Sequence, residues 1–155
     1  MEEIGRKHPA HQPMRERHNT AVIVFLTVCT KDRKSILANP AAHEILLEAW
    51  CMARLWVTGR YIVMPDHVHL FCAPAKLHPQ PLAKWVSFWK SLAARKWFRN
   101  EDAPIWQRHF WDTQLRRGEN YQAKWEYIVA NPVRAGLVSR SADWPYQGEL
   151  NVLRW

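Results

Sequence analysis

The sequence lacks any apolar run long enough to cross a membrane, and its N-terminus carries several charges before the first hydrophobic stretch. Membrane insertion and secretion are therefore not expected, and we predict a cytoplasmic protein. Cysteine is also scarce: the three cysteines have no C-x-x-C spacing, which gives no sign of a structural zinc site. Their apolar surroundings instead favour buried thiols that stay reduced.

Acidic residues are outnumbered by basic residues, 14 against 22, and the net charge is +8. This excess predicts a polyanionic partner, most simply nucleic acid, although a basic chain can also be merely soluble. The 155 residues fit one domain, and no internal repeat is seen. Residues 1–18 mix charges, prolines and histidines without a period, so we expect a flexible arm ahead of a single domain over residues 19–155.

Four runs of apolar, β-branched or alternating residues predict strands. They cover residues 21–30, 60–64, 67–73 and 105–112. Between the second and third runs, Pro65 fits a turn position and Asp66 tolerates the dihedral angles of a tight turn. We therefore expect these two runs to form an antiparallel hairpin.

Two helices are expected between the strands. One begins at Pro40, with Asn39 as a possible cap and Gly59 at its end, and the other covers residues 82–98. The resulting order is strand, helix, strand, strand, helix, strand, which is the order of the ferredoxin-like split βαβ fold. We therefore predict an α+β protein with an antiparallel sheet and both helices on one face.

A third helix is expected over residues 120–131, because the residue before Pro132 avoids the helical region. Tyr127 and Asn131 are four residues apart and would share one face of this helix. Tyr121 lies about 240° around the helix from Tyr127, so the two phenols cannot point to one site. In the alternative interpretation, which periodicity alone favours, Tyr127 packs in the core and Asn131 only caps the helix end.

The run from residue 61 to residue 71 contains two histidines two positions apart. In a strand, this spacing places His67 and His69 on one face, while Val68 points to the other face. Two neutral imidazoles side by side are the beginning of a metal site. The alternative is a histidine-rich strand whose rings are exposed or hydrogen bonded without a metal.

These motifs carry a family resemblance. Residues 59–73, with the core MPDHVHL, resemble the HUH motif of single-tyrosine transposases, in which U is a hydrophobic residue. Residues 106–108, Arg116, the run 127–138 and the tail 143–146 are similar to the REP-associated branch of that family. The resemblance spans about residues 20–147. It implies a ferredoxin-like fold with a C-terminal catalytic helix, and an enzyme that cuts and rejoins single-stranded DNA next to hairpin-forming sequences.

The resemblance also implies roles for individual residues. His67 and His69 match the metal-binding histidines, Asn131 matches an amide ligand to the same metal, and Tyr127 matches the nucleophile that forms a 5′-phosphotyrosine. The implied cofactor is Mg²⁺ or Mn²⁺. One departure is that Thr113 follows Asp112 where many relatives carry an Asp-His pair.

Contacts with DNA are expected from basic side chains, which bind phosphates, and from tryptophan rings, which stack on unpaired bases. The candidates are Lys90, Arg95, Arg108, Arg116, Arg117, Lys124 and Trp106, with Trp97 and Trp111 as further stacking candidates. We expect a monomer or a homodimer that associates with the nucleoid when it acts. Two other functions stay open: a hairpin-binding protein that does not cut, and a metal-dependent nuclease that uses water.

Overall fold

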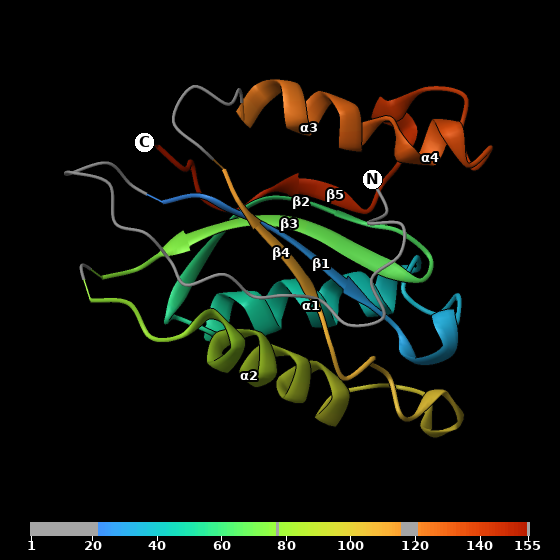
Figure 1. Ribbon diagram of the computed structural model, residues 1–155. Coiled ribbons are helices and arrows are strands. Elements are labelled where there is room, and N and C mark those ends of the chain that lie inside the picture. The colour runs from blue at the N-terminus through green and yellow to red at the C-terminus, as the bar shows by residue number, and fades with distance from the viewer. Residues whose placement is uncertain (1–21, 77, 116–120, 155) are drawn as a thin grey trace.

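The computed structural model describes residues 22–76, 78–115 and 121–154, so the expected arm over residues 1–18 lies outside the described residues. Its centre is a five-stranded sheet in the order β4-β1-β3-β2-β5, in which all neighbouring strands are antiparallel (Figure 1). The strands are β1 (Val24–Cys29), β2 (Trp56–Val63), β3 (His67–Pro74), β4 (Trp111–Gln114) and β5 (Gln147–Glu149).

Helices cover both faces of this sheet. The long helices α1 (Pro40–Met52) and α2 (Leu82–Arg95) lie on one face, and α3 (Tyr121–Val129) and α4 (Asn131–Arg134) lie on the other (Figure 1). The order of the first four strands and the position of α1 and α2 confirm the predicted ferredoxin-like fold. None of the helices in the described ranges is long and apolar enough to span a membrane.

The alternation of side chains along the strands produces two hydrophobic cores. On the α1 and α2 side, residues such as Val68 and Leu70 of β3 pack with Trp50 and Trp89. On the α3 side, the core includes residues of the sheet together with Ile128 of α3 and the downstream Trp144. The members on strands are Phe25, Ile62 and Phe71, and Ile23 directly precedes β1. Both faces of the sheet are therefore buried, and the face that carries His67 and His69 is the one under α3.

The first helix begins as predicted but ends earlier. The Asn39 side chain accepts a hydrogen bond from the Ala42 amide at 2.9 Å, which confirms the cap. The prediction that Gly59 ends this helix is wrong, because α1 stops at Met52 and Gly59 lies inside β2. A Cβ atom at Gly59 would lie 2.6 Å from the Leu153 side chain, which would have to move to admit a larger residue.

Other helix and strand boundaries also differ from those predicted. Helix α2 ends at Arg95. Only the end of the predicted strand 105–112 pairs with β1. The chain before Trp111 forms one isolated bridge, from Trp106 to Thr30. The predicted helix 120–131 is interrupted at Ala130 and restarts as α4, with Pro132 in the first turn, where its missing N–H costs nothing. Strand β5 was not predicted.

Candidate active site

The two histidines of β3 lie side by side on the α3 face of the sheet. Their ring centroids are 4.6 Å apart and the rings meet edge to face. His69 is 6% exposed, whereas His67, at the start of the strand, keeps partial access to solvent. The period of two along β3 therefore places both imidazoles together, as expected from the sequence.

A separate side chain holds the Nδ1 atom of each ring. His67 Nδ1 donates to Asp66 Oδ1 at 2.8 Å, and His69 Nδ1 lies 2.9 Å from the hydroxyl oxygen of Thr27 on β1. No described residue forms a hydrogen bond with either Nε2 atom. Histidines that bind metals through one nitrogen usually have the other nitrogen held in this way, so the pair fits a divalent cation.

The charges around the pair favour imidazoles that can act as ligands. The hydrogen bond from His67, together with the Arg33 guanidinium 2.9 Å away, holds the pKa of the Asp66 carboxyl well below its usual range. Burial lowers the pKa of His69 well below its usual value, and the positive charge of Lys124 acts in the same direction. His69 is therefore neutral at physiological pH, which is the form that binds a metal.

Asn131 is the expected third ligand, and its side-chain oxygen accepts a hydrogen bond from Arg134. No group of three or more His, Cys, Asp or Glu side chains gathers at one place in the described ranges. The expected third ligand, an amide oxygen, is of a different kind from these side chains. Asn131 is the first residue of α4, so its interpretation as the C-terminal cap of the preceding helix is wrong.

Tyr127 is on the surface of α3. Its side chain is 53% exposed, while its neighbour Ile128 is fully buried, so the alternative that Tyr127 packs in the core is wrong. Tyr121, at the other end of the helix, has the opposite environment: its ring lies 4.6 Å from that of Phe71, and its hydroxyl accepts a hydrogen bond from the Arg60 amide at 3.2 Å. The two tyrosines point in different directions, as the helical period predicts.

Arg134, which the sequence analysis did not single out, joins Tyr127 to Asn131. Its guanidinium carbon lies 4.2 Å from the centroid of the Tyr127 ring. Its Nη2 atom donates to the Tyr127 carbonyl oxygen at 2.5 Å and also to the Asn131 side-chain oxygen. The available signal was spacing, since Arg134 follows Asn131 by three residues and lies in the same helical turn.

Helix α3 is connected to the histidine strand through Phe25 of β1. The Lys124 ammonium lies 4.9 Å from the Phe25 ring centroid, and that ring stacks on His69 at 5.2 Å. Lys124 and Tyr127 are three residues apart and share a helix face. The four expected active-site residues thus lie on one side of the sheet as two pairs, His67 with His69 and Tyr127 with Asn131. Among the described residues, no hydrogen bond or ring contact joins one pair directly to the other.

The other expected DNA contacts lie elsewhere. Lys90 and Arg95 are on α2, and Arg108 and Trp106 are in the segment before β4, so none of the four is on the histidine face. The Trp106 indole N–H donates to the Lys90 carbonyl oxygen at 3.1 Å, which fixes the ring between the two segments. Arg116 and Arg117 lie outside the described residues.

Comparisons with known proteins identify the family of the chain. A sequence model of the family described as "Transposase IS200 like" matches residues 19–128, a range that includes both histidines and Tyr127. The chain is 26% identical over 125 residues to the REP-associated tyrosine transposase of Escherichia coli (strain K12), covering 79% of this chain and 73% of that protein.

The fold is similar to that of a solved REP-associated tyrosine transposase bound to a REP hairpin. The TM-score is 0.70 at 23% identity, over 88% of this chain and 82% of that one. The family model covers well over half of the chain. The chain therefore belongs to the IS200-like transposases, a family of enzymes that cut DNA strands and transfer them.

Proposed function

We propose that this transposase cuts and rejoins single-stranded DNA beside hairpin-forming, REP-like sequences, with Tyr127 as the nucleophile and a divalent metal ion bound by His67, His69 and Asn131. The observation that carries the proposal is the histidine pair. Each Nδ1 atom lies within hydrogen-bond distance of a neighbouring side chain, and no described residue forms a hydrogen bond with either Nε2 atom. The names of the relatives, which are tyrosine transposases associated with REP sequences, support the choice of substrate.

The side chains around the histidine pair suit a cation that binds a phosphate. When bound, Mg²⁺ or Mn²⁺ supplies positive charge that neutralises and orients the scissile phosphate. Imidazole ligands favour Mn²⁺ over Mg²⁺, whereas an amide oxygen suits either ion. Lys124 adds a further positive charge on the same side of the sheet, near the Phe25 ring that stacks on His69.

Tyr127 supplies the covalent step. Its phenol oxygen forms a bond to phosphorus, the bond from phosphorus to the 3′ oxygen breaks, and the proton lost by the phenol is balanced by the one gained at the new 3′-hydroxyl. The resulting 5′-phosphotyrosine conserves the phosphodiester bond energy. Attack by a second 3′-hydroxyl joins the strands and releases the tyrosine, so no nucleotide cofactor is needed. The exposed position of Tyr127 allows a DNA strand to reach it.

Arg134 holds the nucleophile and the amide ligand as one unit. Its guanidinium bonds the Tyr127 backbone and the Asn131 side chain and lies over the tyrosine ring. The two hydrogen bonds, both from Nη2, and the contact with the tyrosine ring hold Tyr127 and Asn131 in a fixed relation. We therefore assign Arg134 a positioning role.

The test compares products from a labelled single-stranded hairpin DNA incubated with Mn²⁺ and the purified protein. A transposase yields a covalent adduct between protein and DNA that disappears on protease treatment, and it yields joined strands when a second 3′-hydroxyl is added. Cleaved DNA without an adduct would instead indicate a nuclease that uses water. A mobility shift without cleavage would indicate a binding protein.

A further inference from the structure

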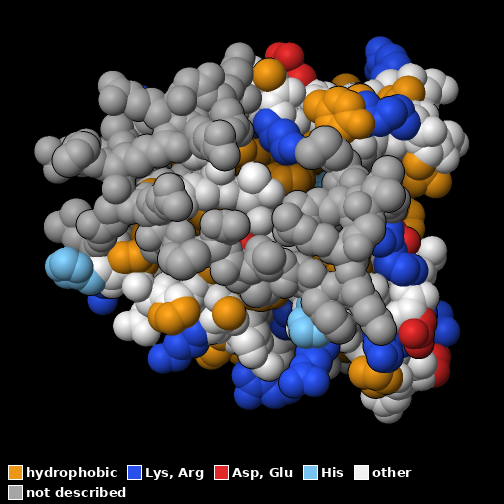
Figure 2. Space-filling view, viewed as in Figure 1, with side chains coloured by type: hydrophobic (Ala, Val, Ile, Leu, Met, Phe, Trp, Pro, Cys, Tyr) orange, Lys and Arg blue, Asp and Glu red, His pale blue; other side chains and the backbone are white. Residues whose placement is uncertain are grey.

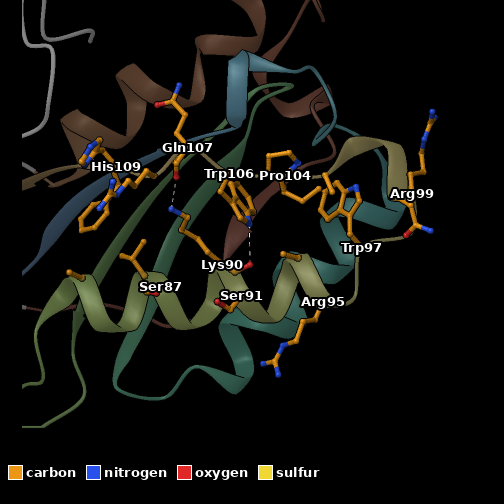
Figure 3. A pocket seen from close by; sticks show the side chains of 18 residues that line it. Ser87, Lys90, Ser91, Arg95, Trp97, Arg99, Pro104, Trp106, Gln107 and His109 are labelled. Atoms are coloured by element: carbon orange, nitrogen blue, oxygen red, sulfur yellow. Dashed lines mark hydrogen bonds between the residues drawn. The ribbon is translucent and has the colours of Figure 1, made fainter.

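A groove lies between α2 and the segment 97–110, away from the face that carries the histidines. Its volume is about 640 Å³. Four of the residues expected to contact DNA, Lys90, Arg95, Trp106 and Arg108, come from two separate segments of the chain and converge on this groove. Figure 3 shows the two segments, with Lys90 reaching from α2 across to the Gln107 backbone. We call it the α2 groove.

The charged side chains that line the α2 groove are all basic. Its lining includes one lysine and three arginines and contains no Asp or Glu. Arg99 is paired with Glu101 at 3.0 Å, but the exposed Arg95 and Arg108 at the rim form no ion pair or hydrogen bond with any described residue. Lys and Arg side chains also gather along the lower edge of the face shown in Figure 2, where α2 lies in Figure 1. Such a surface is complementary to a chain of phosphates.

The α2 side of the groove allows close approach of a ligand backbone. The residues of α2 that line it, apart from the basic residues and Val86, are small: Ala83, Ser87, Ser91 and Ala94. The Lys90 ammonium lies between this helix and the opposite wall, where it donates to the Gln107 carbonyl oxygen at 2.7 Å (Figure 3). Burial lowers the pKa of Lys90, because the charged amine is partly removed from water, and a phosphate nearby would compensate for that loss.

Aromatic rings at one end of the groove favour an unpaired strand over a duplex. Trp97 lines the groove, and its indole N–H donates to Asp102 Oδ2 at 2.9 Å, which fixes the ring. The neighbouring Phe98 ring lies 5.2 Å from it and is 46% exposed. Stacking on aromatic side chains needs bases whose faces are open, and a paired duplex does not offer them.

The α2 groove also ends close to the histidine pair along the sheet. The Gln107 amide donates to the Cys29 carbonyl oxygen at 3.0 Å, and Cys29 of β1 is the register partner of His67 on β3. Two strand spacings, about 10 Å, therefore separate the groove wall at Gln107 from His67. This backbone separation is short compared with the length of a few unpaired nucleotides, so one DNA strand can occupy both places.

We propose that the α2 groove binds the phosphates of an unpaired DNA segment that flanks the scissile phosphate, and that the strand passes around the β4 edge of the sheet to the histidine pair. This inference rests on the proposed function, since it takes its ligand from the same DNA. It adds a second contact surface on the other side of the sheet from Tyr127.

The test measures DNA binding as a function of salt in a Tyr127→Phe background, which prevents turnover. The variant is Arg95→Gln with Arg108→Gln, and the matched control is Arg54→Gln with Lys76→Gln, two exposed basic residues that do not line the groove. The first probe is a labelled hairpin with unpaired nucleotides on both sides of the cleavage site, and the second is the same hairpin without them.

Each lost contact to a single-stranded phosphate lowers the slope of log affinity against log salt by about 0.7. We expect the groove variant to lose about 1.4 from the slope with the first probe and nothing with the second, while the control keeps both slopes. Equal slopes for the groove variant and the control would overturn the inference. An equal loss with both probes would also overturn it, because the groove would then hold the paired stem.

Failure of this inference can be told apart from failure of the proposed function. The binding test needs no chemistry, so a slope change in the groove variant stands even if the protein with an intact Tyr127 forms no adduct. Conversely, the groove variant could show unchanged slopes and still form the adduct normally at saturating DNA. That result would refute the role of the α2 groove but would leave the role of the nucleophile intact.

Discussion

Loss of the Asp66 carboxylate is expected to weaken metal binding much more than folding. The carboxylate holds His67 Nδ1 at 2.8 Å and pairs with the Arg33 guanidinium at 2.9 Å. Partners of this type orient a liganding imidazole and make it more basic, and their removal typically costs 10- to 100-fold in metal affinity. This corresponds to about 1.4 to 2.7 kcal/mol of binding free energy. The ion pair with Arg33 is partly exposed and contributes at most about 1 kcal/mol to stability.

The assay is calorimetric titration of Mn²⁺ into Asp66→Ala, Asp66→Asn and the wild type, with thermal unfolding of each protein in parallel. We expect Asp66→Ala to bind 10- to 100-fold more weakly, and Asp66→Asn to fall between it and the wild type because an amide oxygen still accepts the hydrogen bond. Glu44→Ala, an exposed change on α1, is the control. Unchanged Mn²⁺ affinity in Asp66→Ala would refute the role of Asp66 in orienting a metal-binding His67.

Three further predictions concern the site and the fold. Arg134→Lys keeps the charge but loses the planar guanidinium that lies over the Tyr127 ring and donates from Nη2 to both Tyr127 and Asn131. Single-turnover adduct formation should therefore slow by about 10- to 100-fold, and an unchanged rate would exclude a positioning role. Asn39→Ala removes the α1 cap and should cost about 1 kcal/mol in urea unfolding while the rate of adduct formation stays the same. Burial raises the pKa of Tyr61 to about 12, whereas the phenol of the unfolded chain ionises near pH 10. The free energy of unfolding should therefore fall as the pH rises from about 10 to about 12. Urea titrations at alkaline pH should show a smaller fall for Tyr61→Phe.

The sequence predicted the sheet and the histidine pair because both depend on local periodicity. Alternation along β3 separates Val68 from His67 and His69 whatever the rest of the chain does. The cap at Asn39 is equally local, since its acceptor and the Ala42 amide are three residues apart. The order of strands and helices then leaves few possible arrangements, which is why the overall fold was predicted correctly.

Features that depend on long-range contacts were not predictable in the same way. Gly59 resembles a helix terminator in sequence, but it lies inside β2 and packs against Leu153, which is far along the chain. The short strand β5 has no apolar run and forms because β2 offers a free edge. Basic residues on α2 could be identified as candidates for phosphate contacts, but their convergence with Arg108 on one groove appears only when the two segments are placed side by side.

The central claim is that Tyr127 becomes covalently attached to DNA, and peptide mapping of the adduct tests it most directly. Cleavage after Lys124 and Arg134 produces the tryptic peptide 125–134, in which Tyr127 is the only tyrosine, whereas Tyr121 lies in a separate peptide. After incubation with Mn²⁺ and hairpin DNA and removal of the DNA by nuclease, mass spectrometry should find a 5′-nucleotide on peptide 125–134 of the wild type. Tyr121→Phe should give the same modified peptide, and Tyr127→Phe should give none. A nucleotide on any other peptide, or an adduct that persists in Tyr127→Phe, would contradict the account.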